Sequence, residues 1–374
     1  MATPTDRLPS ERPPAEQHLT ARPSTGPAPP RRIPLPVLVP ALLVGVLLSL
    51  VCGAGLGASG LTWPEVLRYL WAGLTGGAIS PDEVPAYTIV WELRFPRAVL
   101  AAVVGAGLSS IGIAVQAMVR NALADPFVLG ISSGAAVGAN AVLLFGALGA
   151  LGVWALSTAA FVSALAAMAL VYAVARTPRG LTPLRLVLTG TALYYGFSAI
   201  TTFMVFAAER GEAARSAMMW LLGSLGGASW ASVPIAAAAV CAGLAHLAWS
   251  ARRLNALAMG DETAAALGVD AGRFRKELFV VCAAVTGAVV AVSGAIGFVG
   301  LMVPHAVRML VGADHRRLLA VAPLLGALLL IWVDVLSRTL LAPVELPVGV
   351  LTAAVGVPCF VLLMRRNSYT FGGA

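Results

Sequence analysis

The chain has 374 residues, of which 59% are hydrophobic and only 11% are charged, and its formal net charge is +8. Soluble domains carry about 25% charged residues, so this composition excludes an ordinary soluble protein and indicates a membrane protein with several spans. In such a protein the distribution of the basic residues between the two sides matters more than their sum, and we expect no nucleic-acid partner.

Residues 1–36 differ in composition from the rest of the chain. They contain ten prolines and no apolar run, which predicts a disordered cytosolic tail. The first apolar run follows Arg31 and Arg32 and is longer than the core of a signal peptide, so we expect a permanent first helix. Residues 367–374 are predicted to form a second cytosolic tail.

Intervals without charge locate the membrane spans, because about 20 apolar helical residues cross the hydrocarbon core. They predict about ten transmembrane helices within residues 37–366, the eighth being short and interrupted by Pro304. Glycine-rich runs such as GAGLSSIG predict that helices approach each other closely. The expected spans are 37–56, one between 97 and 120, two between 125 and 176, one in 185–209, 231–250, 277–296, 297–310, 318–340 and 347–364.

The basic residues support this topology. With the first tail in the cytosol, 19 of the 25 basic residues lie on the cytosolic side, as the positive-inside rule requires, and both termini are cytosolic. Spans two to five and seven to ten then start from opposite sides, an inverted arrangement common in transporters. Ten helices without internal symmetry remain an alternative.

Residues 252–276 form a cytosolic loop between two apolar blocks. The loop contains two helix-like pieces, Leu254–Met259 and Asp261–Leu267, which Gly260 separates and Gly268 closes. Its apolar residues need either the chain's own surface or a groove on a partner. We interpret the loop as the handle by which a separate protein moves the chain, the alternative being an amphipathic piece on the membrane surface.

Five stretches, in order, resemble one family. They are WELRFPRAVLAAVVGAGLSSIGIAVQAMVRNALADPFVLGISSGAAVGA, MMWLLGSLGGASW, LNALAMGDETAAALGV, GAIGFVGLMVPHAVRMLVGADHR and ELPVGVLTAAVGVPCFVLLMRR. The chain is similar over about residues 37–366 to the FecCD-type permeases, the membrane subunits of ATP-binding cassette (ABC) importers for iron siderophores, haem and cobalamin. The resemblance implies an all-α type II ABC importer permease with inverted halves, in the cytoplasmic membrane of a bacterium.

The resemblance also implies partners. Two permease chains, identical or sister chains, form the passage, two ATPase subunits drive it, and an extracytoplasmic binding protein delivers the substrate. The single lysine, Lys276, follows Arg275 rather than glycine, so the GxxxxGK[ST] phosphate loop is absent. ATP and Mg therefore belong to a separate ATPase chain, and this chain is expected to bind no cofactor and to catalyse no reaction.

Three groups of residues receive roles from the resemblance. In the coupling loop, Leu257, Met259 and Leu267 would contact the ATPase, with Asp261 and Glu262 as caps or polar contacts. The full coupling set is Leu254, Leu257, Met259, Gly260, Asp261, Glu262, Leu267 and Gly268.

Arg94, Arg97 and Arg338 correspond to residues that pair with carboxylates of the binding protein. Binding to lipid headgroups, or pairing within the chain with Glu92 or Asp334, is the alternative.

Asn121 and Leu123 match one element of the family's cytosolic gate, and Thr182 and Pro183 match another. An ordinary turn explains the same residues. The chain departs from the family pattern at Ala122 and Pro183.

No catalytic or metal-binding constellation is apparent. His305, Arg308 and Asp334 are interpreted as structural, with Asp334 able to pair with Arg338 one helical turn later. The four cysteines are scattered and predict neither disulfides nor a metal site.

The most economical reading is a permease for an iron siderophore, with haem and cobalamin as alternative substrates. An ion-coupled secondary transporter would need buried relay residues, of which Asp334 and His305 are nearly the only candidates. A nonconducting membrane scaffold or sensor is a further alternative.

Overall fold

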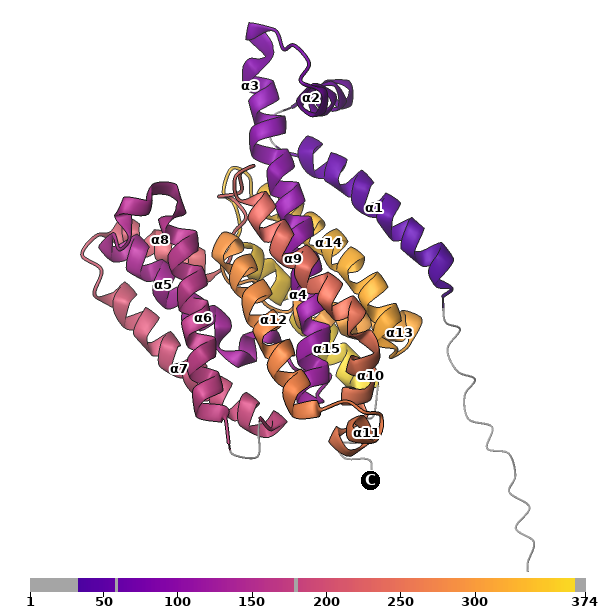
Figure 1. Ribbon diagram of the computed structural model, residues 1–374. Coiled ribbons are helices and arrows are strands. Elements are labelled where there is room, and N and C mark those ends of the chain that lie inside the picture. Colours follow the sequence, from indigo (N-terminus) through magenta and orange to yellow (C-terminus); the bar gives the residue numbers. More distant parts are fainter. Residues whose placement is uncertain (1–32, 58–59, 178–180, 367–374) are drawn as a thin grey trace, which may run out of the picture. The chain divides into compact units, whose positions relative to one another are not determined.

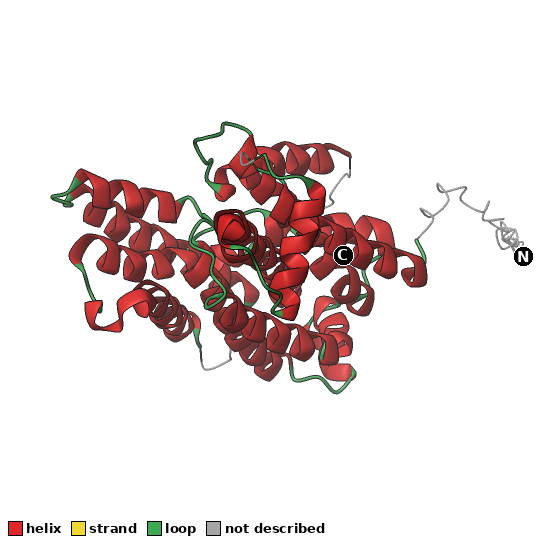
Figure 2. Cartoon of the chain, turned by 90° about the horizontal axis from the view of Figure 1, so that it is seen from above, coloured by secondary structure: helices red, strands yellow, loops and turns green. Residues whose placement is uncertain are grey.

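The computed structural model describes residues 33–57, 60–177 and 181–366, and from Ile33 onward the chain forms one compact unit. Every regular element in these ranges is helical (Figure 2). The α-helices are α1 Leu35–Gly55, α2 Trp63–Thr75, α3 Val84–Tyr87, α4 Phe95–Val119, α5 Ile131–Phe145, α6 Ala155–Ala175, α7 Pro183–Phe206, α8 Gly211–Leu221, α9 Val233–Trp249, α10 Ala251–Ala258, α11 Asp261–Ala266, α12 Ala271–Ser293, α13 Val299–Val311, α14 His315–Thr339 and α15 Val348–Arg366. The shorter or irregular helices are η1 Pro81–Glu83, η2 Thr88–Arg94, η3 Pro126–Leu129 and η4 Gly149–Trp154.

Each of the ten expected spans contains a helix, and the all-α prediction is confirmed. Within the described residues, six helical segments are long and apolar enough to cross a membrane, and α9 with α10, bent by 65°, makes a seventh. The three remaining expected spans correspond to the shorter apolar helices α5, α13 and α15. The eighth span is short as predicted, because α13 has only 13 residues.

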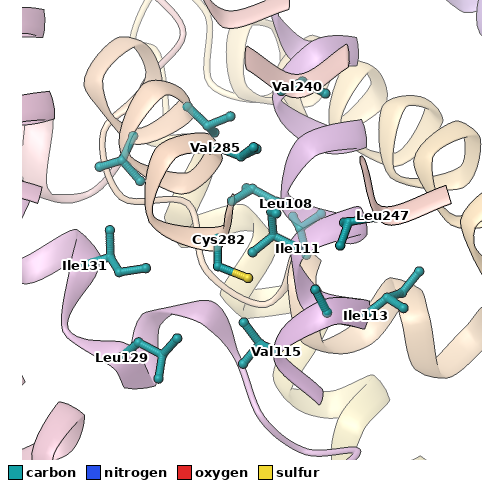
Figure 3. Close-up of a cluster of buried hydrophobic side chains, with 14 of the residues drawn as sticks. Leu108, Ile111, Ile113, Val115, Leu129, Ile131, Val240, Leu247, Cys282 and Val285 are labelled. Atoms are coloured by element: carbon teal, nitrogen blue, oxygen red, sulfur yellow. The ribbon is translucent and has the colours of Figure 1, made fainter. Parts of the chain in front are cut away.

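Helix α4 is the centre of the bundle. The apolar part of its segment is 78% buried, against 6% for α1 and 17% for α7, and it packs on α14, α9, α13 and α12. Figure 3 shows side chains of α4, α9 and α12 meeting in this core, among them Leu108, Val240 and Cys282. The helix therefore has little contact with lipid, whereas α1 and α7 lie at the periphery.

Glycines allow α4 to approach its neighbours closely. A Cβ atom added to Gly105 would lie 2.1 Å from the carbonyl oxygen of Gly326 in α14, and one added to Gly112 would lie 1.9 Å from that of Gly300 in α13. Both glycines belong to the run GAGLSSIG, so the predicted close packing is confirmed.

The two ends of the bundle carry different elements (Figure 1). One end, here the α2 end, carries α2 and α3, while the opposite α10 end carries α10 and α11. Helix α4 runs from the first end to the second. The bundle thus presents two separate surfaces, one at each end of its central helix.

Candidate functional site

The loop predicted to contact a partner forms two short helices at the α10 end. Gly260, with φ of 115°, separates α10 from α11, and Gly268, with φ of 77°, follows α11. Both values lie in the region that favours glycine, which is why the chain breaks at these two positions as predicted.

The four apolar residues of this loop fall into two classes. Leu254 and Leu257 are completely buried in the chain's own core, whereas Met259 and Leu267 are 59% and 61% exposed. Asp261 and Glu262 are also exposed. Since Leu254 and Leu257 are used by the chain itself, Met259 and Leu267 are the large apolar side chains of this set that stay open to a partner.

Arg275 fastens α11 to the membrane helices. This side chain lies in α12 and is only 2% exposed, and it donates from Nη1 to Oδ2 of Asp261 at 2.8 Å and from Nη2 to Oδ1. Its Nε also donates to the carbonyl oxygen of Met118, in the last turn of α4, at 3.3 Å. The hydrogen bond from Arg275 holds the pKa of Asp261 below its ordinary value. One buried guanidinium therefore joins α11, α12 and α4.

Helix α10 has its own links to the bundle. The Asn255 amide donates to Asp314 at 2.9 Å and accepts from the backbone nitrogen of His315 at 2.9 Å, which connects α10 to the start of α14. Arg253 pairs with Glu277 of α12 at 2.9 Å. The contacts of Asn255 and Arg275 could not be predicted from the sequence, because their partners lie on other helices.

At the α2 end, the three predicted docking arginines line a single cavity of about 390 Å³. Arg94 donates to the carbonyl oxygen of Gly55 at 3.1 Å, and Arg338 donates to that of Gly53 at 2.9 Å. Both acceptors lie in the last turn of α1, where carbonyl groups without helical partners attract cations. The end of α1 thus holds two of the arginines in place.

Arg97 is the most deeply buried of the three, with 7% exposure. Its Nε donates to Oδ1 of Asp334 at 2.7 Å, and its Nη1 lies 3.0 and 2.9 Å from the two carboxylate oxygens of Glu345. The second oxygen of Asp334 lies 3.1 Å from Nε of Arg338, as predicted for residues one turn apart. The alternative of pairing within the chain is therefore correct for Arg97 and Arg338, although both still face the cavity.

The two gate motifs lie at the α10 end, on separate elements. Asn121 accepts a hydrogen bond from the backbone nitrogen of Leu123 at 2.8 Å, forming the turn after α4. Thr182 precedes α7 and Pro183 is its first residue; residues 178–180 of this motif lie outside the described residues. Helix η3, which follows the first motif, packs against α7, so the two motifs border neighbouring elements.

A cavity of about 400 Å³ adjoins this region. It is enclosed by η3, α7 and the start of α13, and is lined by Asp125, Phe127, Thr191, Tyr194, Tyr195, Gly297, Phe298 and Leu301. Burial raises the pKa of the Asp125 carboxyl to about 6. The lining is thus mostly aromatic and hydroxylated, with one acidic group.

His305 and Asp334, the two residues considered as relay candidates, are both buried. His305 is buried within α13, and Asp334 is paired with two arginines. Among the residues that the structure describes, no three histidines, cysteines or carboxylates lie together as metal ligands.

The chain was compared with known proteins. It is 43% identical over 309 residues, 82% of this chain and 80% of the relative, to a cobalamin import system permease protein of Halobacterium salinarum. It is 38% identical to a hemin transport system permease protein of Yersinia pestis, over 88% of this chain and 96% of the relative. With an Fe(3+) dicitrate transport system permease protein of Escherichia coli it shares 39% identity, over 75% and 86%.

A solved structure supports the same assignment. A protein described as a metal-chelate type ABC transporter in an inward-facing conformation superposes with a TM-score of 0.77 and 30% identity, over 89% of this chain and all of that chain. The FecCD transport family matches residues 40–366. This chain, with its central α4 and its separate surfaces at the two ends, is a membrane permease of ABC importers and belongs to the FecCD transport family.

Proposed function

We propose that this chain forms one half of a membrane passage for a metal held in a large organic chelate, with an iron siderophore as the specific substrate. Three relatives are named as permeases for cobalamin, hemin and Fe(3+) dicitrate, each of which is a metal held by an organic ligand. Haem and cobalamin satisfy the same argument and are the alternative substrates. The passage needs no covalent chemistry from this chain.

The observation that carries the proposal is the surface of α10 and α11. Met259 and Leu267 are exposed apolar residues on helices held by charged and amide contacts to α4, α12 and α14. Exposed apolar side chains on a fixed support suit the groove of another protein. We assign this surface to a separate ATPase, which would bind ATP and Mg and move the bundle through these contacts.

The orientation follows from this assignment. An ATPase acts in the cytosol, so the α10 end would face the cytosol and the α2 end the outside, with the chain in the cytoplasmic membrane and both termini in the cytosol. The arginine cavity at the α2 end would then receive a carboxylate of the extracytoplasmic binding protein, since its charge is suited to steer an acidic partner.

The gate motifs would close the passage on the cytosolic side. Asn121 with Leu123, and Thr182 with Pro183, border η3 and α7, and the aromatic cavity between these elements would form part of the route. A second permease chain, identical or related, would complete the passage against α7.

Reconstitution of the complex, isolated through a tag on this chain, tests the substrate. Proteoliposomes containing the complex should accumulate a ferric siderophore when ATP is supplied to the ATPase side, and should accumulate haem and cobalamin more slowly. Faster accumulation of haem or cobalamin would reassign the substrate. Accumulation driven by an ion gradient without ATP would contradict the proposed class.

Substitutions test the coupling surface. The double change Met259→Glu and Leu267→Glu should lower the amount of ATPase isolated with the chain about tenfold or more, because it places two charges in an apolar contact. The control is Leu74→Glu in α2, a residue that is 67% exposed at the opposite end, which should leave the ATPase bound. Retention of the ATPase by the double variant would contradict the assignment.

A further inference from the structure

The arginine cavity at the α2 end carries an excess of positive charge. Arg94, Arg97 and Arg338 face it. Asp334 pairs with Arg97 and Arg338, and Glu345 pairs with Arg97, whereas Arg94 donates to the carbonyl oxygen of Gly55. The site thus contains three guanidinium groups and two carboxylates. A partly buried site of this kind attracts one further negative charge.

Arg97 provides a free donor for that charge. Its guanidinium has five N–H groups in a planar fork. Nε is used by Asp334 and Nη1 by Glu345, whereas Nη2 is buried and has no hydrogen-bond partner. Because a buried donor without a partner is costly, this atom favours an incoming acceptor.

The two carboxylates of the site differ in a way that indicates which one can leave. Asp334 is fully buried and contacts both Arg97 and Arg338. The Glu345 side chain is 49% exposed and contacts Arg97 only. Both of its oxygens lie near the same nitrogen, Nη1, instead of spanning Nη1 and Nη2 as in the stronger bidentate pairing. Glu345 is therefore the weakly held ligand of Arg97.

We propose that Glu345 is a resident counter-ion, which occupies Arg97 while the permease is alone and gives way to a carboxylate side chain of the binding protein. The inference rests on the proposed docking role of the cavity. The incoming carboxylate takes the full fork of Arg97, with Arg94 and Arg338 held ready by the carbonyl groups of α1. Glu345 turns outward into solvent.

The exchange requires only a side-chain rotation. The loop that carries Glu345 is fastened to α14, because the backbone nitrogen of Leu346 donates to the carbonyl oxygen of Ser337 at 3.0 Å. Glu345 thus lowers the affinity for the binding protein and, while the site is empty, keeps the arginines from holding other anions.

The affinity of the binding protein for the intact complex tests this role. Glu345→Gln removes the competing charge and retains the shape, so the purified binding protein of the same importer should bind about two to five times more tightly, as expected for a half-exposed ion pair. Glu345→Ala should also bind more tightly, which guards against a specific effect of the amide. The gain should shrink in high salt, because salt screens exposed charges.

Two further variants separate the possible failures. Glu83→Gln is the matched control, because Glu83 pairs with Arg68 at the same end but outside the cavity, and it should leave the affinity unchanged. Arg94→Gln should weaken binding. Unchanged or weaker binding by both Glu345 variants, with weaker binding by Arg94→Gln, would overturn the role of Glu345 alone. Unchanged binding by all of these variants would overturn the docking role of the cavity as well.

Discussion

Arg275 is the residue that joins α11, one of the two helices of the candidate ATPase surface, to the membrane bundle. It contacts Asp261 of α11 and the carbonyl oxygen of Met118 of α4 from its own position in α12. Loss of one partner would leave a buried charge uncompensated, which is far more costly than the pair itself is stabilising. The position of α11 therefore depends on this one side chain more than on the exposed charges around it.

A double-mutant cycle on Asp261 and Arg275 should reveal their coupling. Asp261→Asn and Arg275→Gln should each leave Met259 and Leu267 available to the ATPase but reduce the amount of substrate transported per ATP hydrolysed. We expect a coupling energy between Asp261 and Arg275 of about 1–2 kcal/mol. This value is below that of a fully buried pair, because the Asp261 side chain is half exposed. The measurements belong near pH 7, where Asp261, its pKa lowered by Arg275, is fully ionised.

The partly exposed pair Arg253 and Glu277 provides the control, because it joins α10, the neighbouring helix, to α12. Arg253→Gln should change the transport ratio much less. Equal effects of Arg253→Gln and Arg275→Gln would show that any contact at this end serves equally well.

Among the elements, α4 and α14 cross with very little room between their backbones. Gly105 and Gly326 face each other, and a Cβ atom on either would lie 2.1 or 2.3 Å from the carbonyl oxygen of the other. The obstacle is backbone, which cannot rotate away as a side chain can. The two helices can approach each other this closely only because each of these positions has a hydrogen atom in place of a side chain.

Gly105→Ala and Gly326→Ala should each lower the free energy of unfolding of the purified protein by about 1–3 kcal/mol, since the backbone must shift to admit the added methyl group. Gly45→Ala is the control, because its added Cβ would lie 3.8 Å from Leu328 of α14, an ordinary contact. Thermal melting in detergent or nanodiscs measures all three. Equal melting temperatures would contradict the close approach.

The ten spanning helices could be predicted because each depends on local sequence, whereas α2, α3 and α8 were not predicted. The charge-free intervals gave the spans, and Gly260 and Gly268 gave the ends of α10 and α11. The burial of Leu254 and Leu257 could not be predicted, since the apolar face of an eight-residue helix fits the chain's own core as well as a partner's groove. Asp334 and Arg338 are one turn apart and were paired correctly, but Arg97 and Glu345 are separated by 248 positions, and only the fold brings them together.

At the scale of the whole molecule, the two peripheral helices differ in hydropathy. α1 is 6% buried with a mean hydropathy of 2.6 over its most apolar window, whereas α7 is 17% buried with a value of only 1.2. The face of α1 is suited to lipid. The face of α7 combines exposed apolar residues, such as Leu188 and Phe203, with hydroxyl groups, and it is better suited to another protein or to the passage.

Cross-linking should locate the second permease chain. With the four native cysteines replaced, a cysteine at Leu188 in α7 should cross-link two permease chains within the membrane. A cysteine at Leu47 in α1, a residue that is 62% exposed, should not. Electrophoresis after treatment with a short bismaleimide detects the cross-linked dimer of either variant. A cross-link from α1 alone would place the second permease chain against α1 instead of α7.

Helix α4 also links the two candidate partner surfaces directly. It is an unbroken helix of 25 residues, about 37 Å long at 1.5 Å per residue; its first turn contains Arg97 of the docking cavity and its last turn the Met118 carbonyl held by Arg275. Rigid secondary elements can carry coupling between distant sites. Because α4 has no break, a displacement of one of its ends also displaces the other. A movement imposed at the α10 end would therefore also move Arg97 at the α2 end.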